Sequence, residues 1–288
     1  MVHFHRFSYE RIQTSDYRLR RTHFSFFCLM SIVYLTEYTL NLSNKSEPSP
    51  KVYSGGKNSM AKVVLEGLKD VDKIICLGDI VGYGPLPNEC IDEIRKLSGL
   101  NIVGNHDLAS IGWKDISWFH EYAQSAIIWT MDILTKENKE YLSSLPEIIE
   151  EKDFIMVHGS LYDYTDEYIS EVKKANKSFK LLKERNLLLV GHTHFPRLFI
   201  KKGNYPIYLI RLRDKDTIRI SSDDKLIINV GAVGQPRDKD PRASFGIFDT
   251  DTMEIKTYRV PYNINKTQEL MRKNDLPQFL IDRLTLGY

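Results

Sequence analysis

The sequence predicts an α/β fold whose mixed helix-and-strand part is followed by a second, largely antiparallel sheet. Short apolar runs alternate with helical patterns between residues 60 and 194, and four of these runs end in a glycine beside polar side chains. Residues 197–259 are instead divided by turns into short β segments. Helical patterns that alternate with strands, followed by a run of strands alone, together predict this arrangement.

Residues 1–59 differ from the rest of the chain. Arginines are concentrated in residues 1–23, the first lysine is Lys45, and residues 41–59 are rich in Ser, Asn, Lys, Pro and Gly. We expect a divergent basic N-terminal segment and linker over 1–59, and the main domain over 60–288. The apolar stretch 26–35 is shorter than the ~18 residues of a spanning helix. It is predicted as a buried strand, with an export signal as the minor alternative and no membrane association.

From residue 60 the periodicities become regular. The apolar runs predicted as buried strands lie at 74–77, 102–103, 154–157 and 187–190. Helical patterns cover 60–68, a segment opened by Pro87, 117–144 and 266–271. The later β segments are expected at 197–200, 207–212, 225–230, 244–248 and 254–259.

Composition excludes several classes of protein. The 288 residues are 42% hydrophobic and 27% charged, which is typical of a globular chain and not of a fibrous or disordered one. Forty basic against 38 acidic side chains leave +2, too balanced for a protein that neutralises many phosphates of a nucleic acid. Three cysteines without CxxC spacing favour a reducing cytoplasm over a disulfide scaffold or a thiolate zinc site.

Metal-ligand side chains follow each buried run. They are Asp79, Asn105, His106, His158, His192 and His194. Because sites in open α/β sheets gather at the carboxyl ends of strands, we expect these side chains to share one site. Carboxylate, amide oxygen and imidazole are ligands suited to Mn, Fe, Zn or Ni.

The four motifs at these positions resemble, in the same chain order, those of the calcineurin-like metallophosphoesterase superfamily. They are GDIVGYGP (78–85), GNHD (104–107), HGS (158–160) and GHTH (191–194). Residues 229–245 are similar to a stretch of small prokaryotic members, and the likeness covers about residues 60–288. The resemblance implies a four-layer α/β/β/α sandwich, with two mixed sheets flanked by helices. It also implies hydrolysis of phosphate mono- or diesters by metal-bound hydroxide.

The resemblance further implies roles for individual residues. Asp79 would bridge two divalent ions, with Asn105, His158 and His192 completing one site and His194 serving the other. His106 would act as general acid or transition-state stabiliser, oriented by Asp107. Tyr83 is the candidate for touching the substrate. Arg237 and Arg242 would either bind a phosphate by bidentate contact or pair with neighbouring acids. The acids available for such pairs are Asp238 and Asp240.

The family's first motif, DxH, is absent. One alignment places residues 30–42 on the first strand, with a strand at 30–36 and Glu37 where the Asp belongs; another places residues 53–58 there and supplies no ligand. Three interpretations follow. The favoured one is a working phosphoesterase in which Glu37 substitutes as a metal ligand, with phosphoprotein phosphatase a further inference by analogy. The others are a single-metal binding or regulatory module, and a mis-specified start of the reading frame.

Overall fold

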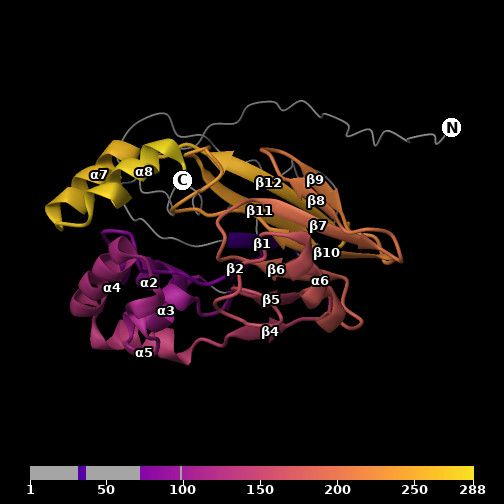
Figure 1. Ribbon diagram of the computed structural model, residues 1–288, viewed down its shortest axis with the longest axis horizontal. Coiled ribbons are helices and arrows are strands. Elements are labelled where there is room, and N and C mark those ends of the chain that lie inside the picture. Colours follow the sequence, from indigo (N-terminus) through magenta and orange to yellow (C-terminus); the bar gives the residue numbers. More distant parts are fainter. Residues whose placement is uncertain (1–31, 37–71, 98) are drawn as a thin grey trace.

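The computed structural model describes residues 32–36, 72–97 and 99–288, and shows two mixed six-stranded sheets flanked by helices (Figure 1). The first sheet has the order β3 (Gly99–Asn101), β2 (Lys73–Cys76), β1 (Ile32–Thr36), β11 (Ala243–Asp249), β12 (Glu254–Val260) and β9 (Thr217–Arg219). The second has the order β4 (Ile148–Glu150), β5 (Ile155–Val157), β6 (Leu187–Val190), β10 (Asp224–Asn229), β7 (Arg197–Lys202) and β8 (Tyr208–Arg211).

The helices lie in three groups (Figure 1). Beside β2 are α2 (Pro87–Lys96), α3 (Asn105–Ser110), the 3₁₀ turn η1 (Ile116–Trp118), α4 (Glu121–Ile133) and α5 (Lys136–Ser144). The pair α7 (Ile264–Lys273) and α8 (Gln278–Leu286) closes the chain, and α6 (Val172–Leu181) contacts β7 and β10. Among the described residues, none of these helices is long and apolar enough to cross a membrane.

Local sequence accounts for the helix boundaries. Pro87 begins α2, where its missing N–H leaves no intrahelical hydrogen bond unmade, and Cys90, Ile91 and Ile94 form its buried face. The side chain of Thr135 accepts a hydrogen bond from the N–H of Asn138 at the start of α5.

Alternating strand residues divide the apolar core by face. Ile74 and Cys76 pack with the helices beside the first sheet, whereas Ile75 and Leu77 pack with residues of the second sheet such as Leu189. Because side chains alternate along a strand, this division places β2 between the helices and the second sheet. The expectation of two mixed sheets flanked by helices is confirmed, and the full four-layer order stays a prediction.

The late strands do not form a sheet of their own, so that expectation is wrong. β7, β8 and β10 join the second sheet through the parallel pair β6–β10, whereas β9, β11 and β12 join the first sheet. Local periodicity identifies a strand but not its partner, and pairing depends on residues far apart in the chain. The helix expected at 60–68 and the boundary at 59/60 lie outside the described residues.

A strand upstream of residue 60 is present, as the first alignment expected. β1 pairs with β2 in the antiparallel direction, with Ile32 opposite Cys76 and Leu35 opposite Lys73. The carboxyl end of β1 therefore lies beside the amino end of β2, at the edge of the sheet away from Asp79.

Candidate metal centre

The metal-ligand side chains lie at the carboxyl ends of strands from both sheets. Asp79 follows β2, Asn105 is the first residue of α3 after β3, and His158 and His192 follow β5 and β6. Asp79 and His192 have left-handed φ angles of 56° and 60°. Residues other than glycine adopt this conformation rarely, and it is commonly retained at functional sites.

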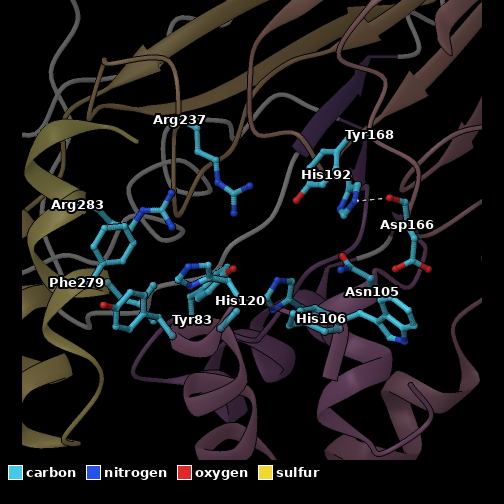
Figure 2. Close-up of a pocket in the computed structure, with 15 residues that line it drawn as sticks. Tyr83, Asn105, His106, His120, Asp166, Tyr168, His192, Arg237, Phe279 and Arg283 are labelled. Carbon is cyan, nitrogen blue, oxygen red and sulfur yellow. Dashed lines mark hydrogen bonds between the residues drawn. The ribbon is translucent and has the colours of Figure 1, made fainter. Parts of the chain in front are cut away.

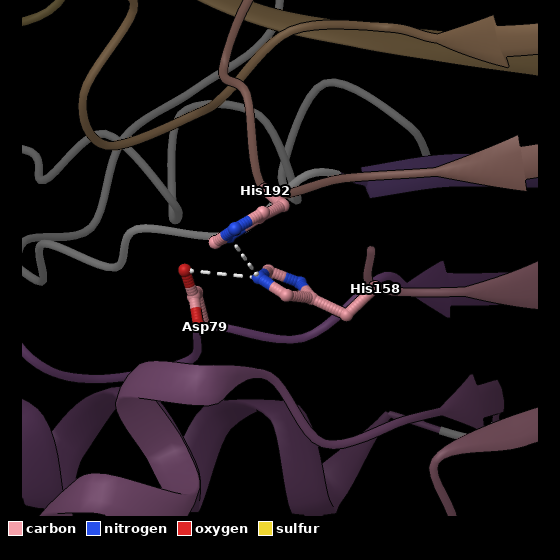
Figure 3. Close-up of side chains that lie close together, drawn as sticks. All are labelled: Asp79, His158 and His192. Carbon is pink, nitrogen blue, oxygen red and sulfur yellow. Dashed lines mark hydrogen bonds and ion pairs between the residues drawn. The ribbon is translucent and has the colours of Figure 1, made fainter. Parts of the chain in front are cut away.

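Four acceptor atoms converge on one point. Nε2 of His158 lies 3.2 Å from Oδ2 of Asp79, 3.2 Å from Oδ1 of Asn105 and 3.2 Å from Nδ1 of His192. The ligand atoms of Asp79, His158 and His192 all lie within 4.8 Å of one another (Figure 3). All four side chains are buried, with at most 6% of their surface exposed. The structure thus brings these four side chains together, and their role as metal ligands stays a prediction.

Backbone carbonyls set the tautomers of both imidazoles. Nδ1–H of His158 donates to the carbonyl of Leu77 at 2.6 Å, and Nε2–H of His192 donates to that of Asp166 at 3.0 Å. The opposite nitrogen of each neutral ring then points a lone pair at the other acceptors. The ring of Tyr168 stacks on His192 with centroids 3.8 Å apart, which further fixes its orientation.

Such a set of acceptors requires a positive charge at its centre. Burial opposes protonation of His158, but the Asp79 carboxylate outweighs this and raises the pKa of His158. A divalent cation meets the same need for all four acceptors at once, and carboxylate, amide oxygen and imidazole are common ligands of transition metals. The residues present therefore fit the metal that the motifs imply.

Glycines allow the two ligand-bearing loops to approach closely. A Cβ on Gly104 would lie 2.2 Å from Oδ1 of Asp79, and a Cβ on Gly78 would lie 2.6 Å from the backbone N of Gly104. Oδ1 of Asp79 instead accepts the N–H of His106 at 3.0 Å. The glycines of GDIV and GNHD are thus required by packing at the site.

His194 lies beside this group but is not part of it. Its Nδ1–H donates to the carbonyl of Gln235 at 2.8 Å, and its Nε2 is 4.0 Å from Oδ2 of Asp79. Burial lowers the pKa of His194 to about 3, so the ring is neutral and able to bind a metal. Within the described part of the chain, the only cluster of three or more His, Cys, Asp or Glu ligands is Asp79, His158 and His192.

Glu37 lies outside the described residues. Because β1 runs antiparallel to β2, its carboxyl end at Thr36 is at the edge of the sheet away from Asp79. The assignment of Glu37 as a metal ligand stays a prediction.

A pocket of about 470 Å³ opens onto Asn105 and His192 (Figure 2). His106, Tyr83 and Arg237 line it, and their proposed contacts with a substrate stay predictions. The His106 ring packs 4.4 Å from that of Tyr83, and burial lowers the pKa of His106 to about 4. Nδ1 of His106 has no hydrogen-bond partner among the described residues.

Asp107 does not orient His106, contrary to expectation. Its Oδ1 accepts the N–H of Val81 at 3.0 Å, and its Oδ2 accepts the N–H of Gly104 at 2.9 Å. Adjacent residues of a helix point in different directions, and Asp107 is the third residue of α3, from which a carboxylate reaches back to the N-cap. Asp107 thus joins the two loops that carry the metal ligands.

The two arginines of residues 237–242 differ in their contacts. Arg242 pairs with Asp240 at 2.6 Å, as the structural alternative expected. Arg237 makes no such pair, and its guanidinium donates to Oε1 of Gln235 at 3.1 Å. Asp238 pairs instead with the buried Arg259.

Sequence reasoning missed the far wall of the pocket. Arg283 and Phe279, both on α8, line it together with residues such as Trp118, which is 90% exposed. No motif marks these positions, and only the packing of α8 near α4 brings them to the pocket; the rings of Phe279 and Tyr122 stack 4.8 Å apart.

Comparisons with known proteins agree with this geometry. The family model of the calcineurin-like phosphoesterase superfamily domain matches residues 56–253. A Methanocaldococcus jannaschii protein described as uncharacterized is 39% identical over 236 residues, covering 78% of this chain and 91% of that protein.

Solved structures extend the likeness to three dimensions. The crystal structure of a metallophosphoesterase from Sphaerobacter thermophilus aligns with a TM-score of 0.72 and 35% identity, over 90% of this chain and 99% of that chain. A hypothetical protein from Pyrococcus horikoshii shares the fold with a TM-score of 0.60 and 22% identity, over 74% and 84% of the two chains. The chain belongs to the calcineurin-like phosphoesterase superfamily.

Proposed function

We propose that this protein hydrolyses phosphate mono- or diesters with a divalent cation held by Asp79, Asn105, His158 and His192. The convergence of these four acceptors beside a pocket that Asn105 and His192 line is the observation that carries the proposal. A divalent cation in such a site polarises a phosphoryl oxygen and lowers the pKa of a bound water.

The side chains around the cation site have separate tasks in this reaction. Asp79 and its three partners hold the cation. His106, which lines the pocket one residue after Asn105, donates a hydrogen bond or a proton to the leaving oxygen. Tyr83 and Arg237 contact the substrate from the pocket wall. Asp107 maintains the distance between the ligand loops through its two backbone hydrogen bonds.

Phosphoproteins are one proposed substrate class among phosphate esters. A pocket of about 470 Å³ with an exposed aromatic mouth has room for a phosphorylated side chain as well as for a small ester. Comparing the rates of hydrolysis of a panel of phosphopeptides with those of small phosphate esters tests the choice. The cytoplasm stays the proposed location on the sequence argument that three cysteines lack the density of a disulfide scaffold.

The second candidate is a single-metal binding or regulatory module. One observation favours it. Among the described residues, Asp79 lies with a complete set of ligands for one cation, whereas His194 is the only further ligand near Asp79 for a second cation. A protein with one cation and no second one would bind a phosphate without turning it over.

Metal content per chain and manganese-dependent hydrolysis of an aryl phosphate separate the two candidates. Turnover with one or two ions supports the enzyme, whereas one ion without turnover supports the binding module. His158→Ala should abolish both tight metal binding and turnover. His120→Ala removes an imidazole from the same pocket wall but not from the ligand set, so it should leave metal content unchanged. His106→Ala should retain the metal and lose most turnover, and full activity in that variant would remove the role of His106.

A further inference from the structure

Two half-buried arginines face the pocket from the wall opposite the cation site. Arg237 follows β10 and Arg283 lies on α8, and both line the cavity that His192 and Asn105 also line. Figure 2 shows both guanidinium groups pointing into the open space of the pocket, with His192 and Asn105 on the other side of it.

Within the described part of the chain, neither guanidinium has an acidic side chain as its partner. Arg237 donates only to Oε1 of Gln235, at 3.1 and 3.3 Å. Nε of Arg283 donates to the main-chain oxygen of Tyr288, and its Nη groups make no hydrogen bond within the described residues. In that same part of the chain, no side-chain carboxylate lies within 4.0 Å of either guanidinium.

The one acid on the pocket wall is already neutralised. The Asp166 carboxylate pairs with Lys114 and accepts the hydroxyl of Thr165 at 2.9 Å. The far half of the pocket is therefore positive.

The two charges also act on each other. Burial lowers the pKa of Arg283 to about 10, and the charge of Arg237 lowers it further in the same direction. Arg237 and Arg283 line the same cavity as Asn105 and His192. Two half-buried guanidinium groups that line one cavity favour the binding of an anion there, because their free N–H donors can be satisfied by its oxygens.

We propose that Arg237 and Arg283 form an anion subsite that binds a second acidic group of the substrate, while the phosphoryl group to be hydrolysed lies at the metal ligands. The preferred substrates are then phosphate esters that carry a further phosphate or carboxylate. Guanidinium groups suit either anion, because their planar N–H donors match two oxygens at once. This inference rests on the proposed function for the position of the first phosphoryl group.

The test compares anions that differ only in the second acidic group. Calorimetry on the manganese-loaded full chain measures α,ω-alkane bisphosphonates of increasing length against the matching alkyl monophosphonates. A charge-assisted contact of this kind corresponds to about a tenfold preference or more for the best bisphosphonate. Arg283→Gln should reduce that preference to about twofold or less while leaving monophosphonate binding nearly unchanged. In the hydrolysis of the corresponding bisphosphates, Arg283→Gln should raise KM by the same factor and leave kcat unchanged.

Two further variants make the result specific. Arg219→Gln removes the same charge from an exposed side chain paired with Glu254, and should leave the preference intact. Arg283→Lys keeps the charge but not the planar fork, and should give an intermediate preference even if the glutamine variant unfolds. A preference for bisphosphonates that survives Arg283→Gln in a folded protein would overturn the subsite. If no phosphate ester is hydrolysed while the binding preference behaves as expected, the proposed function fails and the subsite stands.

Discussion

Replacing Gly104 by alanine should disrupt the metal site through a single methyl group. The added Cβ would lie 2.2 Å from Oδ1 and 2.3 Å from the backbone N of Asp79, whereas ordinary contact begins at 3.4 Å. Because interiors are close-packed, the two loops must separate by about 1 Å to relieve the overlap. Ligand distances tolerate only ~0.2 Å, so the separation removes Asp79 from the cation. The φ angle of Gly104 is −105°, which alanine adopts freely, so the effect is steric alone.

The expected loss in metal affinity for Gly104→Ala is about 10- to 100-fold, comparable with removing an outer-shell partner of a metal ligand. The overlap should also lower the free energy of unfolding by roughly 1–3 kcal/mol. Competition with a chromogenic chelator measures the affinity, and urea unfolding measures the stability.

Gly203→Ala is the matched control, because nothing lies within 4 Å of its added Cβ and its φ is +46°. It should cost only ~1–2 kcal/mol from the left-handed backbone and leave metal affinity unchanged. An unchanged metal affinity in Gly104→Ala would refute the reasoning from close approach.

Three other variants test separate parts of the structure. Asp107→Ala leaves two buried backbone N–H groups without an acceptor and should destabilise the fold by about 2–4 kcal/mol in urea unfolding, with Asp107→Asn milder because it keeps one acceptor. Arg259→Gln breaks a buried pair with Asp238, whose side chains are 3% and 7% exposed, and should cost about 3–5 kcal/mol in the same assay; a cost below 1 kcal/mol would contradict the pairing. Phe248→Ala empties a fully buried position between the sheets and should cost about 3–5 kcal/mol, with a lowered midpoint of thermal unfolding at unchanged metal affinity.

The candidate ligands could be predicted from the sequence because each follows an apolar run directly. The end of a buried strand is a local signal, and parallel strands bring such ends to one edge. His158 and His192 are found together for this reason, since β5 and β6 are parallel neighbours, and the packing of the two sheets brings Asp79 beside them. Asn105 also follows an apolar run, and it is the first residue of a helix.

The parts that could not be predicted depend on non-local packing or on side-chain direction. The division of strands between sheets follows from pairs such as β6–β10, which join residues about forty positions apart. Arg283 reaches the pocket because α8 packs near α4, and nothing near it in the sequence indicates a site. Asp107 was assigned to His106 from the family resemblance, but adjacent helical residues do not face each other, and side-chain direction is not visible in a motif. The direction of β1 is also non-local, since only its partners in the sheet define it.

The central claim is that Asp79, Asn105, His158 and His192 bind one divalent cation. The most direct measurement is an anomalous difference map from crystals of the protein grown with manganese, collected on the low-energy side of the iron edge. The account predicts a peak within roughly 2.0–2.3 Å of Asp79 Oδ2, Asn105 Oδ1, His158 Nε2 and His192 Nδ1. Crystals in which manganese binds elsewhere, or in which these four atoms bind no metal at saturating manganese, would contradict it.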